Sequence, residues 1–370
     1  MRNLLLVCLV CFQFLIYDAF FHRRGAESAE ISQKENSAQP LRSLRLRGEK
    51  QTVHSSSALK LLSVKKIWDQ GEHNAFTDLI RFGNRWFCIF REGKGHADGE
   101  GKLRVLASRD GETWESAALV ELPGKDLRDG KLSIAPGNRL MLVCGAADPS
   151  RNPQSDFHSF VSFSKDGQQW SKLERVEGFN SRSWLWRVLW HKGTAYGAAY
   201  SWEPGTRRNF AVIARSRDGI HYERISKDLE GLNEAALSFD NKDNLTVVLR
   251  SVDSTPNATI AQSRAPFTDW KTKPLIVNGW QNKFGGPAVL RLPDGRIIAG
   301  GRLYGDNITR TGVGLIDLAS GQMTDIVELP SKGDNSYPGF VWHKGKLWMS
   351  YYSSHEGKTS IYLAKIEVAK

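Results

Sequence analysis

The sequence of 370 residues has no long amphipathic helical pattern and few cysteines. From Leu61 onward, short apolar runs alternate with Gly, Asn and Asp, whereas a helix would repeat its apolar residues about every 3.6 positions. The four cysteines match neither a disulfide framework nor a metal-binding spacing. Cys88 and Cys144 lie within apolar runs, so we expect both to be buried thiols. The body of the chain is therefore expected to consist of β-strands without bound metal.

Dense clusters of basic residues are also missing. The chain has 51 Lys and Arg against 40 Asp and Glu, a formal net charge of +11, and the basic residues are scattered along it. This scatter excludes the continuous basic face typical of nucleic-acid binding. A moderately basic body instead suits anionic small molecules or polysaccharides. We expect an acidic glycan as the partner, no nucleic acid, and a monomeric protein.

A long apolar run lies at the N-terminus, from residue 4 to residue 17, after a positively charged start. This arrangement is typical of a secretory signal. An uncleaved anchor attached through residues 4–21 is the alternative, although spanning a bilayer takes about 20 apolar residues. Residues 1–24 are therefore assigned to a signal peptide or membrane anchor, and the polar residues 25–58 to a disordered linker. Both alternatives predict an exported protein, either periplasmic, secreted or anchored at the cell surface.

A seven-residue motif recurs along the body of the chain. Ser-Arg-Asp-Gly-Glu-Thr-Trp begins at Ser108, related copies begin at Ser164 and Ser216, and a degraded copy spans residues 263–270. Asp-Gly predicts a tight hairpin turn, because Gly supplies a positive φ and Asp bonds the backbone N–H groups that follow. Successive copies start 56, 52 and 47 residues apart, and a recurrence near 50 residues is typical of a repeat architecture. We interpret the motif as structural.

Six pairs of apolar runs, each pair separated by a turn, define the repeat unit. The first five pairs continue into a third and a fourth strand, whereas the sixth has only one more, at residues 359–368. Residues 61–67 can supply the missing outer strand and close the ring. The sequence thus predicts an all-β fold, a six-bladed β-propeller over residues 59–370; a β-sandwich would not explain the recurrence. The paired runs are 76–82 and 86–90, 131–135 and 139–144, 185–190 and 194–200, 235–239 and 245–249, 288–292 and 296–301, and 339–342 and 346–351.

Residues at the ends of the first two strands of each unit should meet at one mouth of the axis. Three arginines occupy equivalent places there, each 17 residues after the opening of its unit. Arginine in apolar surroundings needs an anionic partner, which is either a carboxylate on a neighbouring blade or an acidic ligand. Three arginines at one mouth favour a carboxylate, sulfate or phosphate ligand. The expected rim comprises Arg91, Arg250, Arg302, Arg128, Trp184, Tyr337, Tyr351, Glu234 and Asp129, with Asp78 deeper on its strand.

The chain order of Glu234, Arg250, Arg302 and Tyr337 resembles the sialidase (neuraminidase) family pattern. In that pattern an acidic residue, two of three substrate-binding arginines and the tyrosine nucleophile follow one another in this order. The repeated turn motif resembles the sialidase Asp-box (BNR repeat), one residue shorter than its usual form. The resemblance extends loosely over residues 60–370 and departs at the Arg-Ile-Pro motif, where this chain reads His-Asn-Ala-Phe from His73 onward. The sequence is therefore similar to a divergent member of this family.

The resemblance implies an exo-glycosidase that hydrolyses terminal sialic acid or a related acidic sugar without a cofactor. Tyr337 would attack the anomeric carbon, and Glu234 would take the phenol proton. No residue matches the family's acid/base aspartate cleanly. Asp129 is the first substitute and Asp78 the second.

The same resemblance implies that arginines hold the carboxylate of the substrate. Arg250 and Arg302 match the family pattern, and Arg91 is a conjectured third member that would enter from the neighbouring strand. Two alternatives stay open. The first is a non-catalytic glycan-binding propeller at the cell surface, which the missing Arg-Ile-Pro motif favours. The second is a glycosidase for uronic or sulfated sugars.

Overall fold

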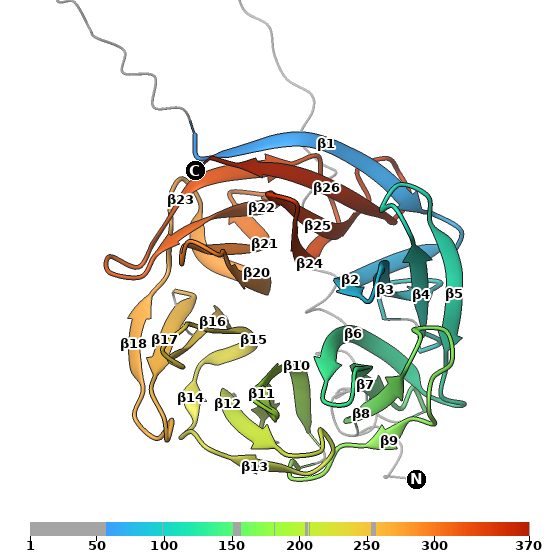
Figure 1. Ribbon diagram of the computed structural model, residues 1–370, viewed down its shortest axis with the longest axis horizontal. Helices are drawn as coiled ribbons and strands as arrows, with labels where there is room; N and C mark the ends of the chain where they lie inside the picture. The colour runs from blue at the N-terminus through green and yellow to red at the C-terminus, as the bar shows by residue number, and fades with distance from the viewer. Residues whose placement is uncertain are drawn as a thin grey trace, which may run out of the picture. The chain divides into compact units, whose positions relative to one another are not determined.

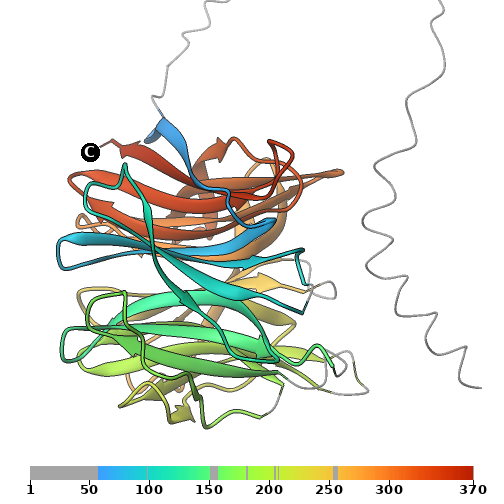
Figure 2. The same ribbon diagram turned by 90° about the vertical axis from the view of Figure 1, so that its right-hand side faces the viewer.

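The computed structural model describes residues 57–97, 99–150, 157–180, 182–203, 206, 208–252 and 257–369. The predicted signal or anchor, residues 1–24, and residues 25–56 of the predicted linker lie outside these ranges. The described residues form six β-sheets arranged around a central axis, as Figure 1 shows; Figure 2 shows the same sheets from the side. The predicted all-β fold, a six-bladed β-propeller, is thereby confirmed. Nowhere in the described ranges is there a helix with the length and apolar character needed to cross a membrane.

The first three blades follow one another in chain order, each with its first strand innermost (Figure 1). Blade 1 contains β2 (His73–Phe82), β3 (Arg85–Gly93), β4 (Lys102–Ser108) and β5 (Glu115–Val120). Blade 2 contains β6 (Asp126–Ala135), β7 (Arg139–Ala147), β8 (Phe157–Ser164) and β9 (Glu174–Arg175). Blade 3 contains β10 (Ser183–His191), β11 (Thr194–Trp202), β12 (Asn209–Ser216), β13 (Tyr222–Arg224) and β14 (Leu229–Glu230).

The remaining blades complete the circle. Blade 4 contains β15 (Leu232–Phe239), β16 (Leu245–Ser251), β17 (Thr259–Ser263) and β18 (Lys271–Pro274). Blade 5 contains β19 (Ile276–Val277), β20 (Gln281–Arg291), β21 (Ile297–Gly305), β22 (Ile308–Asp317) and β23 (Gln322–Leu329). Blade 6 contains β24 (Asn335–His343), β25 (Lys346–Ser353) and β26 (Ser360–Val368), with β1 (Leu59–Trp68) as its outer strand.

The ring is closed by a strand from the other end of the described chain. Strand β1 pairs antiparallel with β26, from Leu59 opposite Val368 to Trp68 opposite Ile361, and both lie at the same edge in Figure 1. This pairing is the one predicted for residues 61–67. Because the first and the last strand share one sheet, blade 6 gains its fourth strand and the ends of the propeller are held together.

Apolar side chains fill the space between neighbouring blades. Between blades 1 and 2, for example, Phe87, Ile89 and Leu142 belong to one buried cluster that also contains Cys144. Cys88 and Cys144 are both fully buried and unpaired, as expected, and burial raises the pKa of each thiol well above its ordinary value. The core is thus a set of layers between sheets.

The Asp-Gly motif forms a capped turn between the third and fourth strands. Oδ1 of Asp110 accepts the N–H groups of Glu112 and Thr113 at 2.7 and 2.9 Å, and also the hydroxyl of Ser108 at 3.0 Å. Gly111 has a φ of 77°, and a Cβ there would lie 2.7 Å from the indole of Trp348 in blade 6. The turn therefore needs glycine both for its backbone conformation and for contact with the next blade.

Candidate functional site

Each of the six innermost strands contains a β-bulge at an equivalent place. The register shift falls within residues 75–78 of β2, 128–131 of β6, 185–187 of β10, 232–235 of β15, 285–288 of β20 and 336–339 of β24. A bulge re-aims a side chain and is often found beside active sites. The residues at these bulges include Phe76, Asp129, Trp186, Glu234 and Tyr337. Phe76, Asp129 and Tyr337 have φ values of 62°, 53° and 49°, which is strained backbone for residues other than glycine.

Tyr337 of blade 6 and Glu234 of blade 4 meet across the axis. The phenol of Tyr337 donates a hydrogen bond to Oε1 of Glu234 at 2.7 Å, and Nη1 of Arg250 donates to the same oxygen at 2.8 Å. Nη1 of Arg250 also lies 3.2 Å from the phenol oxygen. The backbone N–H of Gly286 donates to Oε2 of Glu234 at 2.7 Å, so both carboxylate oxygens are held in place. The structure thus brings together three of the residues that the sequence placed at the rim.

Burial keeps the phenol of Tyr337 in its neutral form. It raises the pKa of Tyr337 well above its ordinary value, and the charge of Glu234 acts in the same direction, whereas Arg250 and Arg302 lower it. Tyr337 is therefore a neutral phenol at neutral pH. Its proton can leave by transfer to a base in hydrogen-bond contact, and the Glu234 carboxylate is that base.

Arg302 lies over the Tyr337 ring. Its guanidinium carbon is 5.2 Å from the ring centroid, and its Nη2 donates to the phenol oxygen of Tyr352 at 2.9 Å and to the carbonyl of Asn335 at 2.6 Å. The side chains of Arg302 and Arg250 retain exposed fractions of 16% and 29%. Two fixed guanidinium groups therefore flank the tyrosine and stay accessible to an anion.

Asp129 extends from the bulge of β6 and is 8% exposed. Its Oδ1 is buried and has no hydrogen-bond partner among the described residues. Burial raises the pKa of Asp129 to about 6; Lys131 opposes this rise and Glu234 adds to it. A carboxyl group with such a pKa is partly protonated near neutral pH, so it can act as a general acid.

Arg91 does not join this centre, although its chain position matches that of Arg250 and Arg302. It is fully buried, its Nη2 lies 2.9 Å from Oδ1 of Asp126, and Nη1 donates to the carbonyl of Gly95 at 2.6 Å. A Cβ on Gly101 would lie 2.2 Å from Nε of Arg91, so the loop closes tightly over the side chain. The conjecture that Arg91 is a third carboxylate-binding arginine is therefore wrong, because Arg91 is enclosed in an ion pair with Asp126 of the next blade.

Asp78 also has a structural role, because both of its oxygens accept hydrogen bonds from neighbouring blades. It is 1% exposed, its Oδ2 accepts the N–H of Leu132 at 2.8 Å, and its Oδ1 accepts Nη1 of Arg187 at 3.1 Å. These contacts connect blade 1 to blades 2 and 3. Asp78 is thus a poor second candidate for the general acid, since both oxygens already bind fixed donors.

The sequence predicts Tyr351 at the rim, but Tyr351 lies on the opposite face of its strand. It is fully buried, donates to the carbonyl of Pro330 at 3.0 Å and stacks on Tyr362. Its neighbour Tyr352 occupies the site instead: the Tyr352 phenol donates to Oδ1 of Asp334 at 2.8 Å. Adjacent residues of a strand point to opposite faces, so an error of one position exchanges site for core.

Two further rim residues lie beside the centre and not in it. Trp184 is buried and packs between Phe157 and Tyr200, whereas Trp186, two positions on, has its ring 5.6 Å from that of Tyr337. Arg128 is 21% exposed, and its Nε donates to Oδ2 of Asp126 at 2.7 Å. Arg128 thus shares the Asp126 carboxylate with Arg91, and part of its side chain remains exposed.

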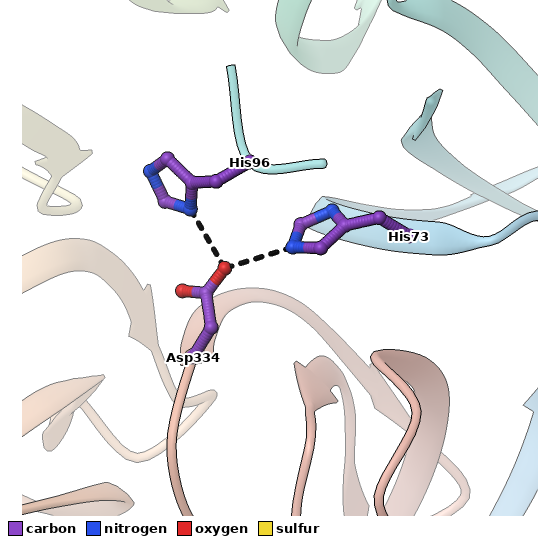
Figure 3. Close-up of side chains that lie close together, drawn as sticks. All are labelled: His73, His96 and Asp334. Carbon is purple, nitrogen blue, oxygen red and sulfur yellow. Dashed lines mark hydrogen bonds and ion pairs between the residues drawn. The ribbon is translucent and has the colours of Figure 1, made fainter. Parts of the chain in front are cut away.

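His73, His96 and Asp334 form a cluster that the sequence does not predict, as Figure 3 shows. Nε2 of His73 and Nδ1 of His96 lie 3.0 and 2.7 Å from Oδ2 of Asp334. Burial alone would raise the pKa of Asp334, but the two histidines and the charge of Arg302 lower it far below its usual range. The available signal was weak: His73 stands where the sialidase pattern has an arginine, and Asp334 precedes Tyr337 by three residues.

No protein-family model and no curated protein matches this sequence. Among solved structures, a protein of unknown function from Dyadobacter fermentans superposes with a TM-score of 0.71 at 17% identity, over 84% of this chain and 99% of that one. The Trypanosoma rangeli sialidase in complex with the inhibitor DANA gives 0.64 at 13% identity, over 80% and 55%. The Penicillium chrysogenum α-L-arabinanase complexed with arabinobiose gives 0.63 at 14% identity, over 82% and 98%.

These similarities concern the fold. The chain resembles propellers that include a sialidase and an arabinanase, and it spans about half the length of the sialidase, 55% of that chain.

Proposed function

We propose that this protein is an exported exo-glycosidase of sialidase type that cleaves a terminal sugar bearing a carboxylate. The observation that supports this proposal is the arrangement of Tyr337, Glu234 and Arg250, with the phenol 2.7 Å from the carboxylate and 3.2 Å from the guanidinium. A phenol paired with a buried base is the nucleophile arrangement that distinguishes sialidases from glycosidases that use two carboxylates.

The proposed reaction has two steps. In the first, Oη of Tyr337 forms a bond to the anomeric carbon, its proton passes to Glu234, and the glycosidic C–O bond breaks as Asp129 protonates the leaving oxygen. In the second, Asp129 takes a proton from water, the water oxygen bonds to the anomeric carbon, and the tyrosyl C–O bond breaks as Glu234 returns the proton. The pKa of about 6 for Asp129 suits a group that must donate a proton and later accept one.

The substrate is proposed to be acidic because two arginines flank the nucleophile. Arg250 and Arg302 both retain accessible surface beside Tyr337. A neutral phenol also avoids the repulsion that a carboxylate nucleophile would have with the substrate's own carboxylate. Sialic acid is the first candidate, and the neighbours include a sialidase solved in complex with it. Export is proposed on the apolar run of residues 4–17.

The second candidate function is a non-catalytic propeller that binds acidic glycans. The burial of Arg91 favours it, because two arginines remain where the sialidase pattern has three. This alternative keeps the two flanking arginines and uses Tyr337 only as a surface for sugar packing.

Turnover of three aryl glycosides by the purified full chain separates these possibilities: an α-sialoside, a β-glucuronide and an α-L-arabinofuranoside. We expect cleavage of the sialoside and, on incubation with 2,3-difluorosialic acid, a covalent adduct on the peptide that contains Tyr337. Cleavage of the arabinofuranoside alone would contradict the acidic substrate. Binding of sialic acid without turnover of any of the three compounds would instead establish the binding propeller.

A further inference from the structure

The cluster of His73, His96 and Asp334 lies beside the proposed active site but has no role in the two-step reaction. The three residues come from the start of β2, the loop between β3 and β4, and the segment just before β24 (Figures 1 and 3). Their donor atoms, Nε2, Nδ1 and Oδ2, all lie within 4.8 Å of one another. Two imidazoles and one carboxylate are a common ligand set for zinc and related divalent metals. We propose that these residues form a binding site for a divalent transition metal, with Zn²⁺ as the first candidate.

The two nitrogen–oxygen distances fit a metal after a small adjustment. Zn–N and Zn–O bonds of about 2.0–2.2 Å place two ligand atoms of one ion roughly 3.3 Å apart in a tetrahedral site. The two histidine nitrogens lie 3.0 and 2.7 Å from Oδ2 of Asp334, so modest movement accommodates the ion. The side chain of His96 is 56% exposed on its loop, whereas that of His73 is 12% exposed, so His96 is the ligand that can move.

The surroundings of Asp334 favour metal binding over a simple ion pair. Its second oxygen, Oδ1, already accepts a hydrogen bond from the phenol of Tyr352 at 2.8 Å and lies 3.3 Å from Nη2 of Arg302. Its backbone N–H donates to Oγ of Ser354 at 2.9 Å. A ligating carboxylate whose other oxygen is fixed by hydrogen bonds is the usual arrangement at protein metal sites. Oδ2 is thereby left facing the two imidazoles, as Figure 3 shows.

The site would join the two ends of the ring. His73 and His96 belong to blade 1, and Asp334 leads into blade 6. Strand β1 is the outer strand of blade 6 and leads along the chain into blade 1, so it connects these two blades at the outer edge. The metal would connect blades 1 and 6 near the axis. A ligand that binds only the folded protein raises its stability with concentration, so Zn²⁺ should raise the melting temperature.

The test is Zn²⁺ binding to the full chain by isothermal titration, with thermal unfolding as a second readout. We expect one site that is lost or weakened on the order of 100-fold or more in His96→Ala, because even residues that only support a ligand change metal affinity by roughly 10–100-fold. Tyr352→Phe, which removes such a support, should weaken binding within that range. Co²⁺ should give the visible absorption of a low-coordinate complex in the wild type and not in His96→Ala.

The matched control is His221→Ala. His221 forms an equivalent pair, with Nδ1 2.8 Å from Oδ2 of Asp218, but belongs to no group of three ligands among the described residues. This variant should bind Zn²⁺ as the wild type does. Because any Zn²⁺ bound by cysteines or histidines elsewhere is common to all variants, the difference between variants isolates the cluster. Equal affinity and equal thermal shift in the wild type and His96→Ala would overturn the proposal.

Discussion

The phenol oxygen of Tyr337 lies 2.7 Å from Oε1 of Glu234, although 103 residues separate the two along the chain. Both residues stand at bulges, one in β24 and the other in β15, on blades that are not neighbours. Gly286, on the intervening blade, bonds the second carboxylate oxygen, and a Cβ there would lie 2.6 Å from the Tyr337 ring. Three bulges thus hold one hydrogen-bonded pair in place.

Tyr337→Phe should abolish turnover and leave binding of an acidic sugar largely intact. The change removes one hydroxyl and keeps the ring that packs between Phe76 and Trp186. Glu234→Gln should share the defect, and the double variant should be little worse than either single one, because the two groups act as a unit. Steady-state kinetics and sugar binding by titration measure both effects.

Tyr351→Phe is the matched control for this experiment, since it removes a buried tyrosine hydroxyl one position from the site. Its turnover should equal that of the wild type. If Tyr337→Phe retained near-full activity, the sialidase-type mechanism would be wrong and the fold would be unaffected.

Arg302→Ala should weaken the binding of an acidic sugar by about 10–100-fold, with a much smaller effect on its neutral analogue. A charge-assisted hydrogen bond contributes roughly 1.5–3 kcal/mol, and the neutral analogue lacks that partner. Arg250→Ala should behave in the same way. Paired titrations with the acid and its amide give the ratio, and equal losses for both ligands would show that the arginines serve only the internal ion pairs.

Arg91→Met provides the contrast for the arginine series. Its ion pair with Asp126 is fully buried, and removing one partner of such a pair typically costs about 3–5 kcal/mol of unfolding free energy. We expect a lower denaturation midpoint with an unchanged ratio of acidic to neutral affinity. A changed ratio of acidic to neutral sugar affinity at unchanged stability would show that Arg91 contributes to binding the carboxylate of the substrate.

Asp129→Asn should have opposite effects on activity and stability. Burial raises the pKa of Asp129 from 3.8 to about 6, so the folded protein binds this proton more tightly than the unfolded chain. Wild-type stability from this group is therefore greatest at low pH and falls as pH rises from about 4 to about 6. Asn cannot ionise, so at pH 8 the variant should be more stable by up to about 3 kcal/mol, whereas near pH 3 the two should be equal.

The activity of Asp129→Asn should fall strongly, since the amide donates no acidic proton. In the wild type, kcat/KM should decrease above pH 6 as the group ionises, and the variant should lose that limb. Denaturant melts and pH–rate profiles on one protein preparation compare both properties. A variant that is less stable at pH 8, or that keeps the alkaline limb, would contradict the assignment.

Asp110→Ala should lower the melting temperature without affecting sugar binding. The carboxylate accepts three hydrogen bonds within the turn, and backbone N–H groups lower its pKa to about 2. Its stabilising effect is therefore present above about pH 4 and lost as pH falls toward 2. Asp269→Ala, in the degraded copy, is the control, because there the backbone carbonyl and not the carboxylate accepts the Ser263 hydroxyl. Calorimetry should show a larger fall in melting temperature for Asp110→Ala at pH 7 than at pH 2, because protonation removes the effect only as pH falls through the folded-state pKa of about 2.

The sequence by itself determined the architecture. The near-50-residue recurrence indicated a repeat architecture, the six paired apolar runs gave the blade number, and the sixth unit, short of one strand, gave the pairing of β1 with β26. Turn chemistry gave the Asp-Gly hairpins, because Asp and Gly act on backbone groups within a few residues. Strand position placed Glu234, Arg250 and Tyr337 at one mouth, and the resemblance to the sialidase pattern singled them out. The architecture and the turns depend on local signals or on a repeated length.

The tertiary structure alone decided which side chains face the centre. Arg91 and Arg302 occupy equivalent chain positions, yet only Arg91 forms a fully buried ion pair with Asp126 of the next blade. No local sequence pattern predicts that partner. Tyr352 rather than Tyr351 reaches the site. Side chains alternate between the two faces of a strand, and the bulge in β24 shifts the pairing with β25 at this point, so the sequence does not show which of the two tyrosines faces the site. His73, His96 and Asp334 meet only because ring closure brings blade 1 beside blade 6, so their proximity depends on a contact between the two ends of the propeller.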